Sequence, residues 1–140
     1  MDSVQTLDEL GVLFENVAFP WPPSVNDFYG KRVIGKLGKQ FVGVYLTKKA
    51  KTFITNVTAT VYQQGLNLKT PHRLRMTAVT CAPTRRKYDI SNYVKLLEDS
   101  LEQAGVYLND NQIDEWVLRR GKIMKPGFIF ITCEIIALAD

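Results

Sequence analysis

Arg85-Arg86-Lys87-Tyr88-Asp89-Ile90-Ser91-Asn92-Tyr93-Val94-Lys95-Leu96-Leu97-Glu98-Asp99 is the stretch around which the chain is organised. A basic triplet runs into an acid, and a segment with helical spacing of apolar residues follows. We expect a helix from about Ile90 to Ala104, capped by Asp89 or Ser91 and ended by a glycine at position 105. Cations that attract phosphate therefore stand directly beside carboxylates.

The remaining patterns place strands and helices on either side of this helix. We expect the following elements: strand Val17–Pro20, a hairpin of residues 32–34 and 40–46, a helix from Thr47 to about Gly65, strand Leu74–Ala82, and strands Asp114–Met124 and Gly127–Ile136. Such segregation favours an α+β fold in which two main helices pack on a mixed or antiparallel β-sheet, with Leu74–Ala82 as a central strand. Residues 1–16 are interpreted as an N-terminal extension with a short helix, and residues 17–140 as one domain.

Composition excludes several classes of protein. The chain has 140 residues, of which 46% are hydrophobic and 23% charged, and its net charge is +4. Its two cysteines stand alone in apolar runs, so neither a disulfide framework nor a zinc site is expected. The longest apolar run, from Phe128 to Ala139, is interrupted by Glu134 and is too short to cross a bilayer. The acidic N-terminus is unlike a signal peptide, and a cytoplasmic protein is expected.

The cations are clustered rather than dispersed. The clusters comprise Lys48, Lys49 and Lys51; Arg85, Arg86 and Lys87; and Arg119, Arg120, Lys122 and Lys125. Clusters of this kind bind phosphate groups, although solvated surface explains most such groups equally well.

The acids nearest the basic triplet have a spacing that permits a shared site. A helix over residues 89–104 is about 22 Å long. An extended return from Gly105 to Asp110 covers about 17 Å and brings Asp110 most of the way back toward Asp89. Carboxylates suit Mg²⁺, and an ammonium such as that of Lys95 stabilises charge developing on a phosphate. Each group also has an ordinary explanation: Asp89 as a helix cap, Asp110 as a turn residue, and Lys95 with Glu98 as a surface pair.

Several spaced motifs resemble the RusA family of Holliday junction resolvases. They are Asp89-Ile90-Ser91-Asn92-Tyr93-Val94-Lys95, Ala104-Gly105-Val106, Leu108-Asn109-Asp110-Asn111 and the early Pro22-Pro23-Ser24-Val25-Asn26. The family carries an Asp-x-Asp-Asn-x-x-Lys signature, a helix that ends in Ala-Gly, and a later acidic turn. The likeness covers about residues 17–136.

The resemblance implies a homodimeric, Mg²⁺-dependent endonuclease that recognises four-way DNA junctions and nicks two strands symmetrically, with Mn²⁺ as a substitute metal. The motif matches assign Asp89 and Asp110 as catalytic metal ligands, Lys95 as the catalytic lysine and Asn92 as a supporting residue. The basic residues Arg85, Arg86, Lys87, Lys48 and Lys49 are expected to bind DNA. Because the family is common in phages and prophages, the expected location is the cytoplasm of a bacterial or phage-infected cell.

One position departs from the family signature. Ser91 stands where the signature has its second aspartate, and a neutral hydroxyl is a weaker Mg²⁺ ligand than a carboxylate. Our hypothesis is that Glu98, on the same helix face, supplies the missing charge as a metal ligand, directly or through water. Two alternatives remain: a junction-binding protein that has lost cleavage through Ser91, and a module without nucleic-acid function whose basic clusters are solvated surface.

Overall fold

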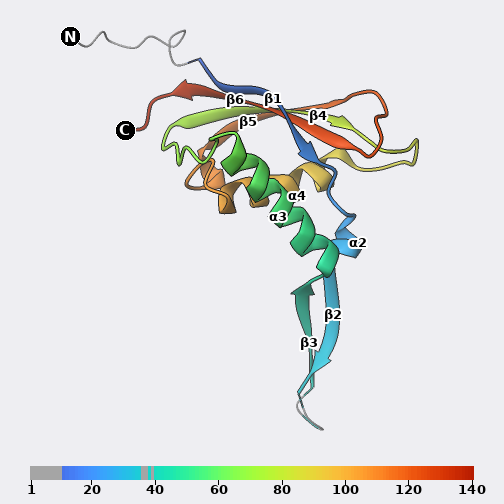
Figure 1. Ribbon diagram of the computed structural model, residues 1–140. Helices are drawn as coiled ribbons and strands as arrows, with labels where there is room; N and C mark the ends of the chain where they lie inside the picture. Colours follow the sequence, from blue (N-terminus) through green and yellow to red (C-terminus); the bar gives the residue numbers. More distant parts are fainter. Residues whose placement is uncertain (1–10, 36–37, 39) are drawn as a thin grey trace, which may run out of the picture.

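A four-stranded sheet with two helices on one face forms the body of the molecule (Figure 1). The computed structural model describes residues 11–35, 38 and 40–140. The strands of the sheet are β1 (Val12–Pro20), β4 (Arg73–Cys81), β5 (Ile113–Arg120) and β6 (Phe128–Ala137). Their order is β1-β6-β4-β5, in which β4 and β5 are parallel and the other pairs antiparallel. The predicted α+β class, the mixed sheet and the central position of β4 are confirmed.

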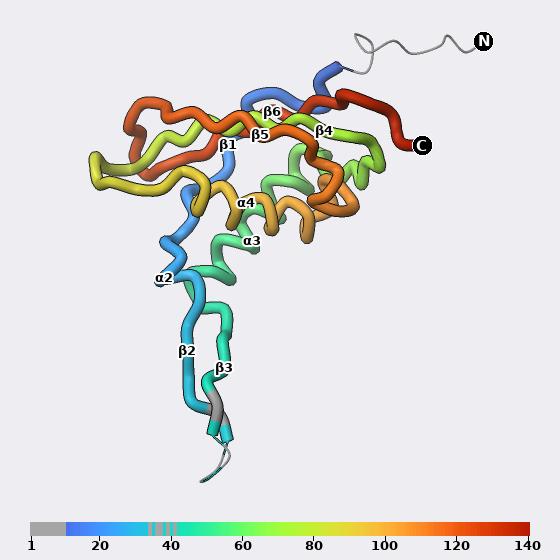
Figure 2. The backbone as a smooth tube through the Cα atoms, turned by 180° about the vertical axis from the view of Figure 1, so that it is seen from behind, coloured from blue at the N-terminus to red at the C-terminus, as the bar shows by residue number. Residues whose placement is uncertain are grey.

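Helices α3 (Lys48–Gln63) and α4 (Ile90–Gln103) cover the same face of the sheet, as Figures 1 and 2 show from opposite sides. Thr47 caps α3, because its hydroxyl oxygen accepts a hydrogen bond from the Ala50 N–H at 3.2 Å. Gly105 ends α4 with a φ of 88°, as the sequence predicts. The core residues of α4, Leu97 and Leu101, are fully buried. Truncation of either leucine to alanine would cost about 2–5 kcal/mol of stability.

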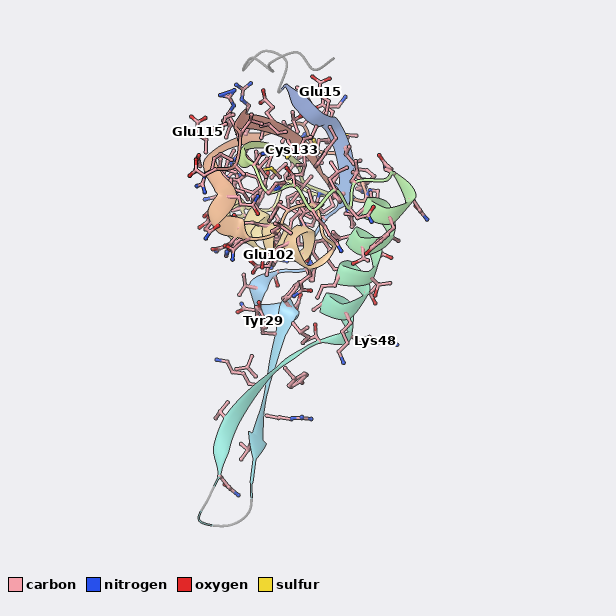
Figure 3. The ribbon with its side chains drawn as sticks, turned by 90° about the vertical axis from the view of Figure 1, so that its left-hand side faces the viewer. Glu15, Tyr29, Lys48, Glu102, Glu115 and Cys133 are labelled. Atoms are coloured by element: carbon pink, nitrogen blue, oxygen red, sulfur yellow. The ribbon has the colours of Figure 1, made fainter. Side chains whose placement is uncertain are left out.

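The hairpin of β2 (Tyr29–Ile34) and β3 (Phe41–Leu46) leaves the body as a separate two-stranded arm (Figures 1 and 3). It follows the short helix α2 (Val25–Phe28), for which the sequence predicts no helix or strand. The Thr47 hydroxyl ties the base of the arm to the body, since it donates to the Asp27 carbonyl at 2.5 Å. The predicted hairpin is confirmed, and its projection from the sheet is a feature that the strand pattern does not reveal.

The N-terminal helix expected within residues 1–16 is wrong for residues 12–16, which belong to strand β1. Residues 1–10 lie outside the described part of the chain. Pairing of β1 with β6 begins at Val12 opposite Glu134, and long-range sheet pairing outweighs the local helical spacing of the leucines. The division of the chain at residue 16 stays a prediction.

Candidate active site

Asp89 sits at the start of α4, where it caps the helix. Its Oδ1 accepts hydrogen bonds from the Ser91 backbone N–H at 3.1 Å and from the Ser91 hydroxyl at 2.8 Å. Ser91 therefore supports the Asp89 carboxylate in place of adding a second one. Asn92 follows as an exposed residue on the first turn.

Lys95 lies among three carboxylates one to two turns further along α4. Its Nζ is 2.7 Å from Glu98 Oε2, 3.2 Å from Asp99 Oδ1 and 3.4 Å from Asp110 Oδ2. The first two partners are at helical i+3 and i+4 spacing, whereas Asp110 comes from the turn after the helix. The hydrogen bond to Glu98 is the main cause of a raised pKa for Lys95, so the ammonium stays charged at neutral pH.

Glu98 is the most tightly held acid of this group. Its side chain is only 12% exposed, and its second oxygen, Oε1, accepts a hydrogen bond of 2.8 Å from the Trp116 indole N–H on β5. The Tyr107 hydroxyl donates to the Glu98 backbone carbonyl at 2.6 Å, and burial raises the pKa of Tyr107. Strand β5 therefore fixes the carboxylate that in turn holds Lys95.

A short 3₁₀ helix, η1 (Asp110–Gln112), presents Asp110 to the lysine. The Asp110 backbone N–H donates to Glu102 Oε1 at 2.6 Å, which ties the turn to α4. The buried Gln112 side chain accepts from the Leu108 and Asn109 N–H groups, each at 2.8 Å, and donates to the Thr70 carbonyl at 2.7 Å. The position of Asp110 is therefore fixed by side chains rather than left to a mobile loop.

Arg73 on β4 secures the other end of the same turn. Its guanidinium donates to the Asn111 carbonyl at 2.8 Å and forms an ion pair with Asp114. The hydrogen bond from Arg73 is the largest cause of the lowered pKa of Asp114.

The carboxylates of Glu98, Asp99 and Asp110 are close enough to bind one cation together. Each offers an oxygen that lies within 4.8 Å of the other two. Three carboxylate oxygens are the hard donor set that Mg²⁺ prefers, so the residues fit the metal that the sequence predicts.

Asp89 is not in this group within the part of the chain that the structure describes. Asp89 precedes Glu98 by nine positions in the sequence, which is about 13 Å along the helix axis. The structure thus brings Lys95, Glu98 and Asp110 together and places Asp89 with Ser91 at the opposite end of the site.

The predicted DNA-binding cations lie in two places. Arg85, Arg86 and Lys87 line a hollow of about 450 Å³, and Arg120 at the end of β5 joins them there. Lys48 and Lys49 lie at the start of α3, beside an apolar hollow of about 620 Å³ walled by Trp21 and Phe53. Arg120 also lies over the Tyr88 ring, with its guanidinium carbon 4.4 Å from the ring centre. Arg120 belongs to a basic cluster of the sequence for which no specific role is predicted.

Several further residues of the site are not predicted by the sequence motifs. The spacing of two of them could have indicated their contacts. Asp99 is at i+4 from Lys95, and Gln112 has the capping-box spacing from Asn109. Three others reach the site from strands that are distant in the sequence, so no local spacing predicts their contacts: Arg73, Trp116 and Arg120.

Residues 20–132 match the family model described as endodeoxyribonuclease RusA. The chain belongs to this family. A crossover junction endodeoxyribonuclease of Enterobacteria phage HK97 is 32% identical over 108 residues, which are 77% of this chain and 82% of the phage protein. Proteins of the same name from Shigella sonnei and Escherichia coli K12 are 24% and 23% identical, each over 84% of this chain and 91% of their own length.

Membership of the RusA family confirms the resemblance seen in the spaced motifs and the prediction of an enzyme that hydrolyses DNA. The matched segment contains the whole candidate site, from Arg73 to Arg120, together with the arm. Within the described residues, the structure contains no helix long and apolar enough to span a membrane.

Proposed function

We propose that this protein is a Mg²⁺-dependent endonuclease that resolves four-way DNA junctions by paired nicks, in recombination and repair. The observation that carries the proposal is Lys95 Nζ held 3.4 Å from Asp110 and 2.7 Å from Glu98, in a chain whose relatives are named crossover junction endodeoxyribonucleases. The scissile phosphate belongs beside Lys95.

In this proposal the cationic and acidic residues of the site have different roles. The Lys95 ammonium stabilises negative charge that develops on the phosphate during attack by water. Glu98, Asp99 and Asp110 would hold the metal, and Glu98 would supply the negative charge that Ser91 lacks. A Mg²⁺ held by these residues would supply Lewis acidity that favours attack by water on the phosphate. Water would attack phosphorus in line and the bond from phosphorus to the 3′ oxygen would break, so the products would carry a 5′-phosphate and a 3′-hydroxyl.

Asp89 has a supporting place in this proposal. In the sequence only Tyr88 separates it from the basic residues Arg85–Lys87, and hydrogen bonds from Ser91 fix its carboxylate. We propose that the Asp89 carboxylate would serve as a further metal ligand when DNA is bound, as its match to the family signature implies. Asn92 supports the same turn.

A homodimer is part of the proposal, because two nicks placed symmetrically on a four-way junction need two equivalent sites. The arm offers the surface for it. Val33, Val42 and Val44 share one face of the ribbon and are 64%, 62% and 64% exposed. The ribbon extends away from the body (Figure 3), and a two-stranded ribbon is marginally stable alone, so we propose that a second copy of the arm covers it. Residues 17–140 would form the catalytic domain, at work in the cytoplasm of a bacterial or phage-infected cell.

A second candidate function follows from Ser91. If three carboxylates without a second signature aspartate do not support catalysis, the protein binds junctions and leaves them intact.

Incubation of the purified protein with an end-labelled four-way junction and Mg²⁺ separates these functions. Paired nicks support the nuclease, a shifted but uncut junction supports the binder, and neither result supports a module without nucleic-acid function. Asp110→Asn and Lys95→Met should each lower the cleavage rate by about 10²-fold or more while junction binding persists. Glu115→Gln is the matched control, since Glu115 is an exposed acid on β5 that pairs with Arg75 outside the site.

A further inference from the structure

Three hollows adjoin one another beside the start of α4. The first, the Arg120 hollow, is lined by Arg85, Arg86, Lys87 and Arg120 around Tyr88. The second, the Tyr93 hollow of about 250 Å³, shares Arg86, Lys87 and Tyr88 with the first. The third, the Phe53 hollow, shares Trp21 with the second and carries Lys48 and Lys49. Tyr88 therefore stands between the first and second hollows, and Trp21 between the second and third.

Charge identifies the kind of molecule that fits this series. Six cations border it: Lys48, Lys49, Arg85, Arg86, Lys87 and Arg120. Among the described residues that line the three hollows, none is acidic. A chain of phosphates complements such a border, and each phosphate neutralised by a cation releases counterions.

The partitions between the hollows are aromatic and rigidly braced. Trp21 lies 4.9 Å from Tyr93 and meets the edge of the Tyr88 ring at 5.1 Å, centre to centre. The Tyr88 hydroxyl is 2.9 Å from Thr80 Oγ1, and its ring carries the Arg120 guanidinium. Tyr88 is thus a packed aromatic, and the planar surfaces left at the hollows are those of Arg120 and Trp21. Planar groups of both kinds stack on nucleobases.

Duplex DNA does not match this arrangement, because its bases are paired and stacked within a cylinder and present no face to a wall. An unpaired strand presents its bases to the partitions and its phosphates to the cations. We propose that the three hollows form a track for a short single-stranded DNA segment, which would be the strand unpaired at the branch point. Placed beside Asp89, the track would guide that strand toward Lys95.

The track rests on the proposed function only in that DNA is the partner, and its test uses neither a junction nor metal. The chain has two tryptophans, so Trp116→Phe leaves Trp21 as a single reporter. Titration of this variant with an eight-nucleotide oligothymidylate in EDTA should quench Trp21 fluorescence, and an eight-base-pair duplex should not. Trp21→Phe, which leaves Trp116 as reporter, should give no quenching.

Matched charge variants of the Trp116→Phe protein separate the track from general attraction to DNA. Arg120→Ala should weaken oligothymidylate binding at least about fivefold, because a stacking contact is worth roughly 1–3 kcal/mol. Lys122→Ala removes the same charge two residues away, outside the hollows, and should change affinity less than about twofold by comparison. An unquenched Trp21, equal quenching by the duplex, or equal weakening by the two variants would overturn the track. Junction cleavage by the wild-type protein in Mg²⁺ would stand whichever result is found, so the two proposals fail separately.

Discussion

The Trp116 indole N–H donates a hydrogen bond of 2.8 Å to Glu98 Oε1, while Glu98 Oε2 accepts one of 2.7 Å from Lys95. Both oxygens of one carboxylate are thus engaged, and a strand of the sheet reaches the lysine through a single side chain. Trp116 therefore acts as a positioning residue for Lys95.

Trp116→Phe keeps the aromatic packing and removes the N–H donor. Glu98 becomes free to rotate, so Lys95 loses its fixed geometry, and the cleavage rate at saturating junction should fall about tenfold. Junction affinity should stay within about twofold, because the cations that bind phosphate are untouched. Single-turnover cleavage and gel-shift titration measure the two quantities. A parallel loss of affinity and rate would indicate general damage to the fold.

Glu98→Gln tests whether this acid carries catalytic charge as well as position. A glutamine can still accept from Trp116, so the side chain stays in place, yet the negative charge beside Lys95 is gone. Cleavage should fall severely, by about 10²-fold or more, while junction binding survives. Unaltered cleavage would exclude the hypothesis that Glu98 compensates for Ser91. Glu102→Gln is the control for an acid of the same helix. Glu102 contacts the site only by accepting a hydrogen bond from the Asp110 backbone N–H, and a glutamine oxygen can still accept it.

Gln112→Ala should destabilise both the fold and the site. The substitution leaves the Leu108 and Asn109 N–H groups and the Thr70 carbonyl without their partner, at a cost of about 1–3 kcal/mol. The turn that presents Asp110 should loosen, so cleavage should fall further than the loss of folded protein explains. Thermal unfolding followed by circular dichroism gives the first effect, and cleavage at a temperature where both proteins are folded gives the second. Asn111→Ala is the control, because the Asn111 side chain is exposed and its backbone carries the contacts to Arg73 and Asn109.

The ion pair of Arg73 and Asp114 makes the stability of the folded protein depend on pH. The hydrogen bond from Arg73 lowers the pKa of Asp114 below its ordinary 3.8, so the folded state holds the carboxylate in its charged form more strongly than the unfolded chain does. The stabilisation is fully present above pH 3.8 and is lost as the pH falls through the lower pKa of the folded state. The melting temperature of the wild-type protein should therefore exceed that of Asp114→Asn by a constant margin from pH 5 to 8. That margin should shrink in acid.

Ionic strength provides the control for this pair. Both side chains are accessible to solvent, at 41% and 39% exposure, so 1 M NaCl should screen most of the attraction and shrink the margin at neutral pH. A margin insensitive to salt and acid would mean that Asp114 acts through packing.

In the candidate site, contacts between residues close in the sequence can be predicted, and contacts across the sheet cannot. Lys95 and Glu98 are paired by helical spacing, and the lengths of α4 and its return bring Asp110 near Lys95. The same arithmetic does not place Asp89, because a capping carboxylate turns toward its own helix and bonds Ser91. Trp116 lies 18 residues after Glu98, and Arg73 lies 37 residues before Asp110. Their contacts depend on sheet pairing, which no local sequence pattern predicts.

The fold shows the same division. Capping and periodicity predict α3 and α4 to within one or two residues, since these helices bury one apolar stripe each. The helical spacing of Val4, Leu7, Leu10 and Leu13 predicts a short helix within residues 1–16, yet β6 pairs with residues 12–16 as a strand. Helix α2 has four residues, too few for any period to show.

Substitution of the arm valines tests the proposed dimer. Val42 is 62% exposed on a ribbon that projects from the body, so Val42→Lys should leave the fold intact. In a dimer covered by a second arm, the lysine would be buried without a partner, and the dimer dissociation constant should rise at least about tenfold. Sedimentation velocity over a range of concentrations measures the shift from dimer to monomer.

The matched control for the arm is Tyr62→Lys, because Tyr62 is 58% exposed on α3 in the body of the molecule. This variant should sediment as the wild-type protein does. An equal shift in both variants would place the interface elsewhere, and a monomeric wild-type protein at micromolar concentration would contradict the dimer. Because symmetric nicks need both sites at once, Val42→Lys should also uncouple the two cuts, so that singly nicked junctions accumulate before resolved products appear. In contrast, Tyr62→Lys should release both nicks together, which makes the product ratio an independent readout of the same interface.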